Sequence, residues 1–295
     1  MPPASSNTIS LNNGRKYKLS DILPEVISLG EMLVSNAHLK AASPLPADTD
    51  LSESEQKEVQ DQITALSVLP PAAKSIFWSA FAAKHLPDIA AALRQLSHAT
   101  QHQAISTAIQ ILSLMPDPKQ EPYFRKFLRN SAASKDLPTI IANAFATEGT
   151  AWKPPASPFL HCTLIIHTLF WCDPSLGDDG KASIDASVRT ALAAALNTML
   201  ADPRIRAKPL VDRVDVERLL NILNVIDSGE IPGSYYLDST REYLEGQIDM
   251  CSGDLCDEDA ELSCSKCKTV RYCGEECQSW HWKNGHKARC FTTEY

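Results

Sequence analysis

Residues of the types that bind transition metals crowd into the C-terminal part of the chain. Seven of the nine cysteines lie between Cys251 and Cys290, and one histidine accompanies them at a similar spacing. The candidate ligands are Cys251, Cys256, Cys264, Cys267, Cys273, Cys277, His286 and Cys290. They form four close pairs, and two such pairs supply the four donors of a tetrahedral zinc ion. The spacing therefore predicts two zinc ions.

The chemistry of this segment favours metal over other uses of cysteine. Paired spacing with a histidine points to metal ligation in a reducing compartment rather than to disulfides, so we expect the protein in the cytoplasm, the nucleus or both. A packed core of reduced thiols is a poor alternative, because the segment is rich in Asp, Glu, Lys and Ser. All eight donors are used, which leaves no open position for a catalytic water. We expect the zinc to be structural and to supply the folding energy of this small unit.

The residues around the ligands resemble the MYND-type zinc finger. The similar stretches are Arg271-Tyr272-Cys273, Cys277-Gln278, Trp282 and His286-Lys287-Ala288-Arg289-Cys290. The ligand pairs interleave in that family. The resemblance therefore implies one zinc on Cys251, Cys256, Cys273 and Cys277, and a second on Cys264, Cys267, His286 and Cys290. It covers only about residues 251–290, followed by a tail at 291–295.

Two departures from the family pattern bear on the ligand set. The first pair, Cys251 and Cys256, encloses four residues where the family usually has two, and one extra residue separates Trp282 from His286. The second departure makes His281 an alternative to His286. Cys290 lies four positions after His286, so these two can share one helical turn, which favours His286.

The resemblance also implies the kind of partner. Fingers of this family dock short peptides, often with proline, so we expect partner proteins to bind through proline- or leucine-containing motifs. We expect an extended peptide to pair with the strand-like edge at 270–272 while its apolar residue packs on the finger's helix. The expected peptide-binding residues are Val270, Arg271, Tyr272, Gln278 and Trp282. An alternative is that Tyr272 and Trp282 only cover the metal sites.

Charge argues against nucleic acid as a partner. The chain has a net charge of -8, and residues 251–295 hold six Lys and Arg against eight Asp and Glu. Two zinc ions with seven thiolates bring this segment to about -5, which phosphate backbones repel. A transcriptional regulator that contacts DNA is therefore only an alternative. We expect no membrane span, because the apolar stretch 160–172 is shorter than the roughly 20 residues required.

We expect no enzymatic activity. The chain has 11 glycines and none between Gly30 and Gly149, whereas nucleotide-binding turns need glycine where the backbone approaches a ligand. A lysine methyltransferase is the alternative, because some MYND fingers lie within split SET domains, but the sequence has no Asn-His-x-Cys-like stretch. His161, Cys162, His167 and Cys172 form another group, yet helical spacing spreads them over different faces, so they predict a buried helix with free thiols.

The elements that carry the finger read as helices. Residues 20–250 predict an all-helical array of roughly eleven helices, of which a HEAT- or armadillo-like stack is one form. We expect no strand before residue 250, and residues 1–19 predict a loose arm. Ser52 and Glu55 form a capping box. Five prolines fit the first turns of helices, namely Pro71, Pro87, Pro122, Pro138 and Pro158. Later helices are predicted at 104–115, 183–200, 211–227 and 234–248, with Gly149 and Gly229 as C-terminal caps.

Overall fold

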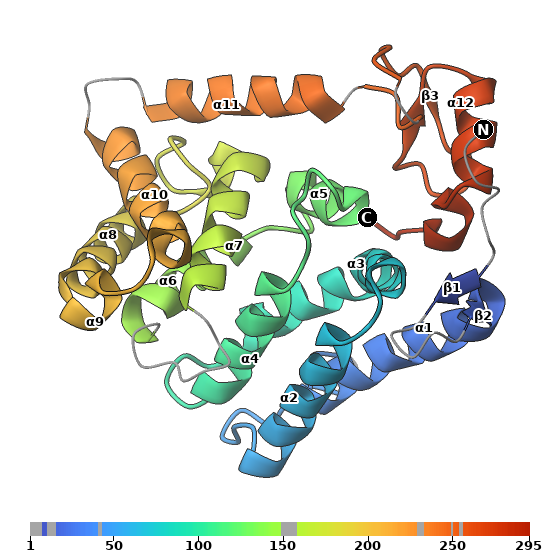
Figure 1. The fold of residues 1–295 in the computed structure, drawn as a ribbon. Coiled ribbons are helices and arrows are strands. Elements are labelled where there is room, and N and C mark those ends of the chain that lie inside the picture. Colours follow the sequence, from blue (N-terminus) through green and yellow to red (C-terminus); the bar gives the residue numbers. More distant parts are fainter. Residues whose placement is uncertain are drawn as a thin grey trace.

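The fold combines a large helical part with a small C-terminal finger (Figure 1). The computed structural model describes residues 8–10, 16–40, 43–148, 158–228, 233–248, 250–253 and 256–295. The predicted class, an all-helical array followed by a two-zinc finger, is confirmed within these residues. The expected caps Gly149 and Gly229 lie outside them.

The helices pack on one another around a shared apolar core. The first six are α1 (Leu19–Asn36), α2 (Glu53–Ser67), α3 (Pro71–Gln95), α4 (His102–Ser113), α5 (Pro122–Arg129) and α6 (Leu137–Glu148). The next five are α7 (Pro158–Trp171), α8 (Ala186–Ala201), α9 (Pro203–Arg206), α10 (Leu210–Asp227) and α11 (Gly233–Ile248). The main packing pairs are α1 with α3, α6 with α8, and α7 with α10. None of the described helices is long and apolar enough to span a lipid bilayer.

Local capping explains several helix starts. The Ser52 hydroxyl accepts a hydrogen bond from the Glu55 amide at 3.3 Å, and the Glu55 carboxylate accepts one from the Ser52 amide at 2.8 Å. This confirms the capping box, a device that typically contributes about 1 kcal/mol. Pro122 opens α5, where the Glu121 side chain caps the Tyr123 amide. These starts could be predicted because each depends on neighbours within three residues.

The predicted helix start at Pro87 is wrong. Pro87 lies inside α3, which continues without interruption from Pro71 to Gln95. A proline within a helix removes one backbone hydrogen bond at a cost of roughly 3 kcal/mol. Apolar side chains on both sides of it, among them Phe81 and Ile89, are buried in the core. Their burial offsets the cost of the proline, so tertiary packing overrides the local signal.

The expectation of no strand before residue 250 is also wrong. Strand β1 (Thr8–Ser10) pairs antiparallel with β2 (Lys16–Lys18), with Ile9 opposite Tyr17. Each strand has only three residues, too few to show an alternating pattern in the sequence. The single-turn helix α9 was missed for the same reason, since it is four residues long.

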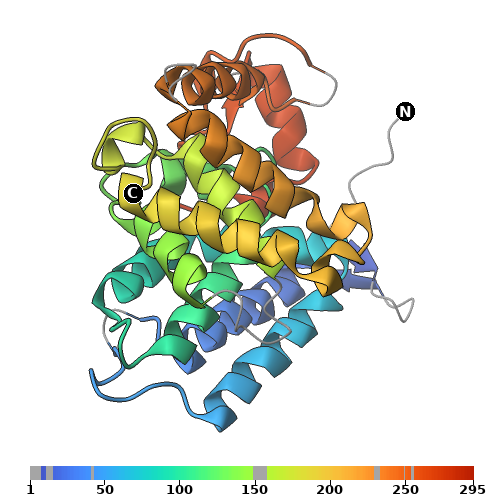
Figure 2. The same ribbon diagram turned by 90° about the vertical axis from the view of Figure 1, so that its left-hand side faces the viewer.

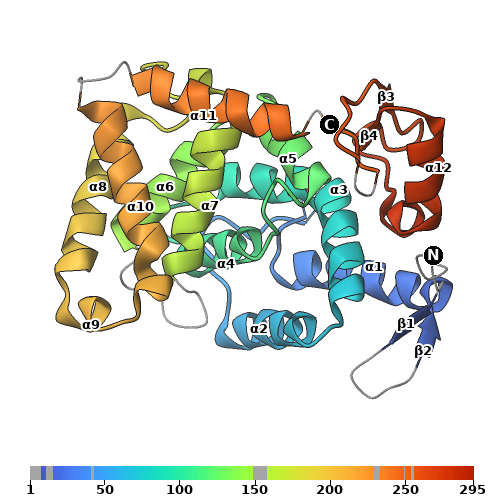
Figure 3. The same cartoon turned by 45° about the horizontal axis from the view of Figure 1, so that its top comes forward.

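The finger lies at one end of the helical part, beside α3 and α5 (Figure 3). It contains β3 (Leu262–Ser263), β4 (Arg271–Tyr272), α12 (Glu275–Lys283) and a 3-10 turn, η2 (His286–Arg289). Figure 2 shows α11 and the finger on the same side of the helical part. The C-terminal segment returns to the helices: the Tyr295 hydroxyl donates to the carbonyl of Ala82 in α3 at 2.7 Å. The C-terminal segment thus ties the finger to the helical part.

Candidate metal centre

The structure brings the first four predicted ligands together. The sulfur atoms of Cys251, Cys256, Cys273 and Cys277 all lie within 4.8 Å of one another. The Cys273 sulfur is 3.6 Å from those of both Cys256 and Cys277. Tetrahedral zinc with bonds of about 2.3 Å separates its sulfur ligands by roughly 3.8 Å. The observed spacing therefore fits one zinc ion, and we name this set the all-cysteine site.

The other four predicted ligands form a second, more deeply buried set. The donor atoms of Cys264, Cys267, His286 and Cys290 also lie within 4.8 Å of one another, and all four residues are buried. The Cys264 and Cys290 sulfurs are 3.8 Å apart, and the Cys267 sulfur is 3.7 Å from His286 Nε2. We name this set the cysteine–histidine site. The pairing in both sites is the interleaved one that the resemblance implies.

The protonation chemistry of both sites favours a cation. Hydrogen bonds with neighbouring thiols, Cys251 first, raise the pKa of Cys273 to about 12. Burial, and then the charge of Cys267, raise the pKa of Cys290 to about 12. Burial lowers the pKa of His286 to about 4, so its imidazole is neutral at neutral pH, as a metal ligand must be. Thiolates crowded in this way are stabilised by a divalent ion, and the two sites fit two structural zinc ions.

Gly253 lies next to the all-cysteine site, where there is no room for a larger residue. The sequence alone did not predict this role. A Cβ atom at Gly253 would lie 2.8 Å from the Cys277 sulfur and 3.3 Å from the Cys251 sulfur. The Gly253 amide also donates to the Cys251 sulfur at 3.3 Å. The glycine between the first two cysteines therefore lets the longer loop between Cys251 and Cys256 close onto the ion.

His281 belongs to neither metal site. Its Nδ1 is 3.1 Å from the hydroxyl of Tyr272, a residue with no exposed surface. Burial, and then the charge of Arg289, lower the pKa of His281 to about 4. His281 is thus a neutral partner of a buried tyrosine, and His286 is the histidine that joins the cysteines.

The expected strand edge is already paired, so docking by strand addition at 270–272 is contradicted. The Val270 carbonyl accepts from the Cys264 amide at 2.8 Å, and the Arg271 carbonyl accepts from the Ser252 amide at 2.9 Å. Val270 is only 7% exposed and Tyr272 is 0% exposed. The Tyr272 side chain therefore supports the finger from inside and offers no surface to a peptide.

The two remaining predicted residues lie on α12 and are partly exposed. Gln278 and Trp282 are both of intermediate exposure. The Trp282 ring meets the His286 ring edge to face, with centroids 5.8 Å apart. Trp282 thus covers one side of the cysteine–histidine site and also presents an aromatic surface at the exterior, so both expected roles are compatible with its position.

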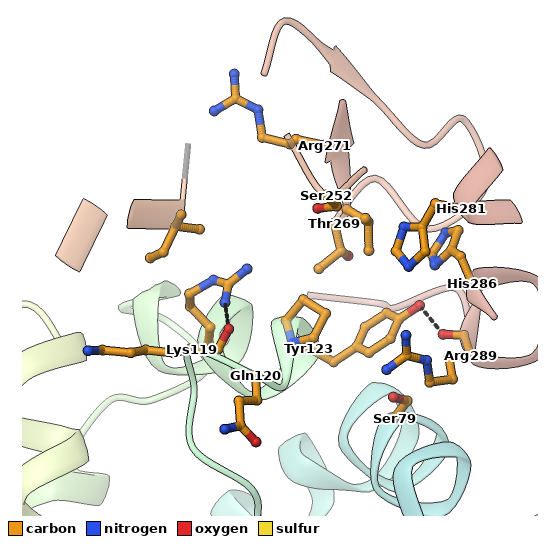
Figure 4. Close-up of a pocket in the computed structure, with 14 residues that line it drawn as sticks. Ser79, Lys119, Gln120, Tyr123, Ser252, Thr269, Arg271, His281, His286 and Arg289 are labelled. Carbon is orange, nitrogen blue, oxygen red and sulfur yellow. Dashed lines mark hydrogen bonds between the residues drawn. The ribbon is translucent and has the colours of Figure 1, made fainter. Parts of the chain in front are cut away.

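A cleft of about 150 Å³ separates the finger from α5 (Figure 4). Ser252, Thr269 and Arg271 line it from the finger, and Lys119 and Tyr123 line it from the helical part. Sequence reading could not find Lys119 and Tyr123, because only the folded chain brings them to the finger. The cleft is smaller than the roughly 300–1,000 Å³ of small-molecule sites.

The cysteine of α7, Cys162, and Cys172 directly after that helix are free and buried, as expected. Cys162 and Cys172 have no disulfide partner among the described residues, and burial raises the pKa of Cys172 to about 12. His161 Nδ1 is 2.6 Å from the Ser113 hydroxyl on α4. These residues tie α7 to the core.

Comparison with known proteins identifies the finger. The MYND finger model matches residues 250–290. Ubiquitin carboxyl-terminal hydrolase 19 of Arabidopsis thaliana is 38% identical over 58 residues, which are 20% of this chain and 8% of that relative. Ubiquitin C-terminal hydrolase 15 of Oryza sativa subsp. japonica is 51% identical over 35 residues, which are 12% of this chain and 4% of that relative. No solved structure matches the chain significantly.

The likeness is confined to a small part of each relative. The matched segments cover no more than 8% of the length of these two proteins. MYND fingers are zinc-binding domains that mediate protein interactions. The geometry of both metal sites and the family match agree, and the chain therefore contains a MYND-type zinc finger at residues 250–290.

Proposed function

We propose that this protein is a non-enzymatic interaction protein whose finger docks short proline- or leucine-containing peptides of partner proteins. The observation that carries the proposal is the closure of both metal sites. Four protein donors converge at each site, so neither zinc ion keeps a position for substrate or water. The surface of the finger, and not the zinc ions, then binds the partner.

The helical part acts as the scaffold that presents the finger. The finger is fixed against α3 and α5 by the C-terminal segment, and Lys126 of α5 donates to the Thr293 hydroxyl at 2.5 Å. A fixed finger loses less entropy when it binds a peptide than a freely tethered one does. We place the protein in the cytoplasm or nucleus, where thiols stay reduced for zinc.

The docking surface centres on Trp282 and Gln278 of α12. Aromatic side chains supply rigid apolar area for proline and leucine, and an amide can fix the direction of a peptide backbone. Because strand addition is excluded, side-chain contacts carry the binding. We expect a dissociation constant on the order of 10⁻⁵ M for so small a surface.

The test is titration of the full chain with proline- and leucine-containing peptides, monitored by calorimetry. Trp282→Ala should abolish saturable binding. Trp280→Ala is the matched control, because Trp280 lies on the same helix two residues away and therefore on another face. Zinc content is measured in both variants, since Trp282 contacts a metal ligand. Equal peptide binding by the Trp282→Ala protein at unchanged zinc content would refute the docking surface.

The relatives are named as ubiquitin carboxyl-terminal hydrolases. Because this chain matches no more than 8% of either of them, we do not propose hydrolase activity for it. The methyltransferase alternative predicts binding of S-adenosylmethionine. Calorimetry with S-adenosylmethionine should show no heat of binding. A micromolar affinity for this cofactor would favour the methyltransferase over the interaction protein.

A further inference from the structure

The two metal sites of the finger differ in their exposure to solvent. Every ligand residue of the cysteine–histidine site is at most 3% exposed. In the all-cysteine site only Cys251 is buried, whereas Cys256, Cys273 and Cys277 are partly exposed. A small reactant dissolved in water can therefore approach the all-cysteine site more easily than the cysteine–histidine site.

The helical part shields the more deeply buried site. The turn η2, which contains His286, contacts α3, and Arg289 of that turn donates to the Ser75 hydroxyl of α3 at 3.1 Å. Figure 4 shows His286 and Arg289 on the side of the finger that faces the helices. In the all-cysteine site, the Cys251 amide donates to the Glu258 carbonyl at 2.9 Å, a bond within the finger. Packing on the helices thus protects the cysteine–histidine site.

The number of thiolates also separates the two sites. Four thiolates around one zinc ion have a formal charge of about -2, whereas three thiolates and an imidazole have about -1. The thiolate is the nucleophilic form of cysteine, and oxidants react with thiolates that solvent can reach. Thiolate content and exposure therefore both make the all-cysteine site the more reactive one.

Two sulfur pairs of this site are close enough to form a disulfide after a small movement. The Cys273 sulfur is 3.6 Å from the sulfurs of both Cys256 and Cys277. A disulfide has a sulfur–sulfur distance of about 2.05 Å, so the two atoms must approach by roughly 1.5 Å. Cys273 belongs to both pairs, so a disulfide in this site is expected to include it.

We propose that the all-cysteine site is a peroxide-sensitive zinc site. Oxidation joins Cys273 to Cys256 or Cys277 and releases one zinc ion, while the cysteine–histidine site keeps its ion. Because Cys277 lies in the first turn of α12, this release detaches the start of that helix from the metal. The inference does not depend on the docking of peptides.

The chemical step needs hydrogen peroxide as the oxidant and no other reactant. One thiolate attacks a peroxide oxygen, which gives a sulfenic acid and hydroxide. The second thiolate attacks the sulfur of the sulfenic acid, forms the disulfide and expels a second hydroxide, and both hydroxides take up protons. Two thiolates, one peroxide and two protons thus give one disulfide and two water molecules. The zinc ion then retains only two of its four protein ligands and dissociates.

The test is titration of the full, zinc-loaded chain with hydrogen peroxide, with released zinc measured by a zinc-binding dye. Release should occur in a first phase of one ion per chain, and the second ion should leave only at higher doses. After free thiols are blocked, mass spectrometry of the first-phase product should find a disulfide that joins Cys273 to Cys256 or Cys277. A thiol reductant and added zinc should restore two ions per chain.

Two serine variants identify the site that loses its ion. Cys251→Ser removes a ligand of the all-cysteine site, and the ion left in the cysteine–histidine site should stay bound at the dose that completes the first phase in the parent. Cys264→Ser is the matched control, because it removes a ligand of the other site. Its remaining ion should be released at that dose. If either variant binds no zinc, the disulfide found in the parent decides the assignment.

Three results would overturn the inference. The first is loss of both ions in one phase. The second is a first-phase disulfide at Cys264 or Cys290, or zinc release from Cys251→Ser but not from Cys264→Ser. The third is retention of both ions at a dose that oxidises Met32, a methionine that is 51% exposed and reports that peroxide has reacted with the protein surface.

Discussion

The hydroxyl of Tyr123 bonds the backbone on both sides of the zinc ligand Cys290. It donates to the Arg289 carbonyl at 2.9 Å and accepts from the Phe291 amide at 2.8 Å. Tyr123 is 1% exposed and belongs to α5 of the helical part, so a buried residue far away in the sequence fixes the geometry of the cysteine–histidine site. Zinc binding and docking of the finger on the helices are therefore thermodynamically coupled.

Tyr123→Phe should weaken zinc binding at the cysteine–histidine site. The substitution removes two partly buried hydrogen bonds, each with a net value of about 1 kcal/mol or less, and leaves two backbone groups without their partner. We expect about a tenfold lower zinc affinity at one of the two sites, measured by competition with a chelator. Tyr235→Phe, at an exposed position of α11, is the control. Equal affinity in both variants would refute the coupling.

Removal of both zinc ions should leave most of the helical signal but lower the melting temperature. The helices have their own apolar core, whereas the contacts of Tyr123 and Tyr295 with the finger and tail depend on a folded finger. Far-UV circular dichroism before and after chelation measures both quantities. Complete loss of helix on chelation, or an unchanged melting temperature, would show that this division between core and finger is wrong.

Two zinc ions per chain are expected, and Cys251 should be required for one of them. Cys251→Ser removes a donor of the all-cysteine site. Burial opposes ionisation of Cys251, but hydrogen bonds within that site outweigh it and lower the pKa of this thiol to about 7. Elemental analysis should therefore find about one ion in this variant. Cys162→Ala changes a buried cysteine outside both sites and should retain two. A full zinc content in Cys251→Ser would exclude Cys251 as a ligand.

The metal sites could be predicted from the sequence because their information is local. Eight donors at fixed short spacings define both sets, and the interleaved pairing follows from the family resemblance alone. The cleft between the finger and α5 could not be predicted, because its lining residues Lys119 and Arg271 are far apart in the chain and are brought to one cleft only by the packing of the finger on the helices. The spacing of residues along the sequence does not show which distant residues come to lie beside one cleft.

Two expectations, a free strand edge at 270–272 and a helix start at Pro87, failed because contacts with distant residues determine the structure there. The pattern around Tyr272 identified a strand correctly, but the segment at Ser252 pairs with its outer edge, which removes the expected peptide site. Pro87 has the local chemistry of a helix start, yet α3 passes through it because the residues on both sides are buried. Sequence patterns thus predict features that depend on neighbouring residues, such as helix caps. They fail for features that depend on burial against distant parts of the chain.

Stability should fall as the pH falls from about 6.5 to 4. Burial lowers the pKa of His85 and of His161 to about 4, against about 6.5 in the unfolded chain. Each histidine is neutral in the fold, so its contribution is fully present above pH 6.5 and is lost as the pH falls through 4. For His85, the charge of Glu31 opposes this shift, whereas those of Lys84 and Lys40 add to it.

Replacement of His161 should reduce this pH dependence. Each histidine accounts for up to about 3 kcal/mol of the difference in unfolding free energy between pH 7 and pH 4. Urea unfolding of His161→Gln at both pH values should show a smaller difference than the parent, with His98→Gln as the control at a partly exposed position. An identical pH profile for His161→Gln and the parent would contradict the assignment.

The guanidinium of Arg189 joins α8 to the end of α10 and to the loop before α8. Its side chain is 1% exposed, and it donates to the carboxylates of Asp227 at 2.7 Å and Asp179 at 2.6 Å. It also donates to the Ile184 carbonyl at 2.7 Å. A planar guanidinium can satisfy these three acceptors at once, which the ammonium of lysine cannot do with the same geometry.

Arg189→Leu should therefore destabilise the helical part. Removal of one partner from a buried ion network leaves carboxylates near apolar groups, and we expect a loss of about 2–3 kcal/mol, less than for a fully buried pair because Asp179 and Asp227 are partly exposed. Arg204→Leu is the control: its arginine pairs with Asp202 but is 90% exposed, so no measurable change is expected. Arg189→Lys should recover part of the loss, since it restores the charge without the bidentate geometry. If urea unfolding finds Arg189→Leu as stable as Arg204→Leu, the network does not hold α8 and α10 together, and apolar packing between these helices alone accounts for their position.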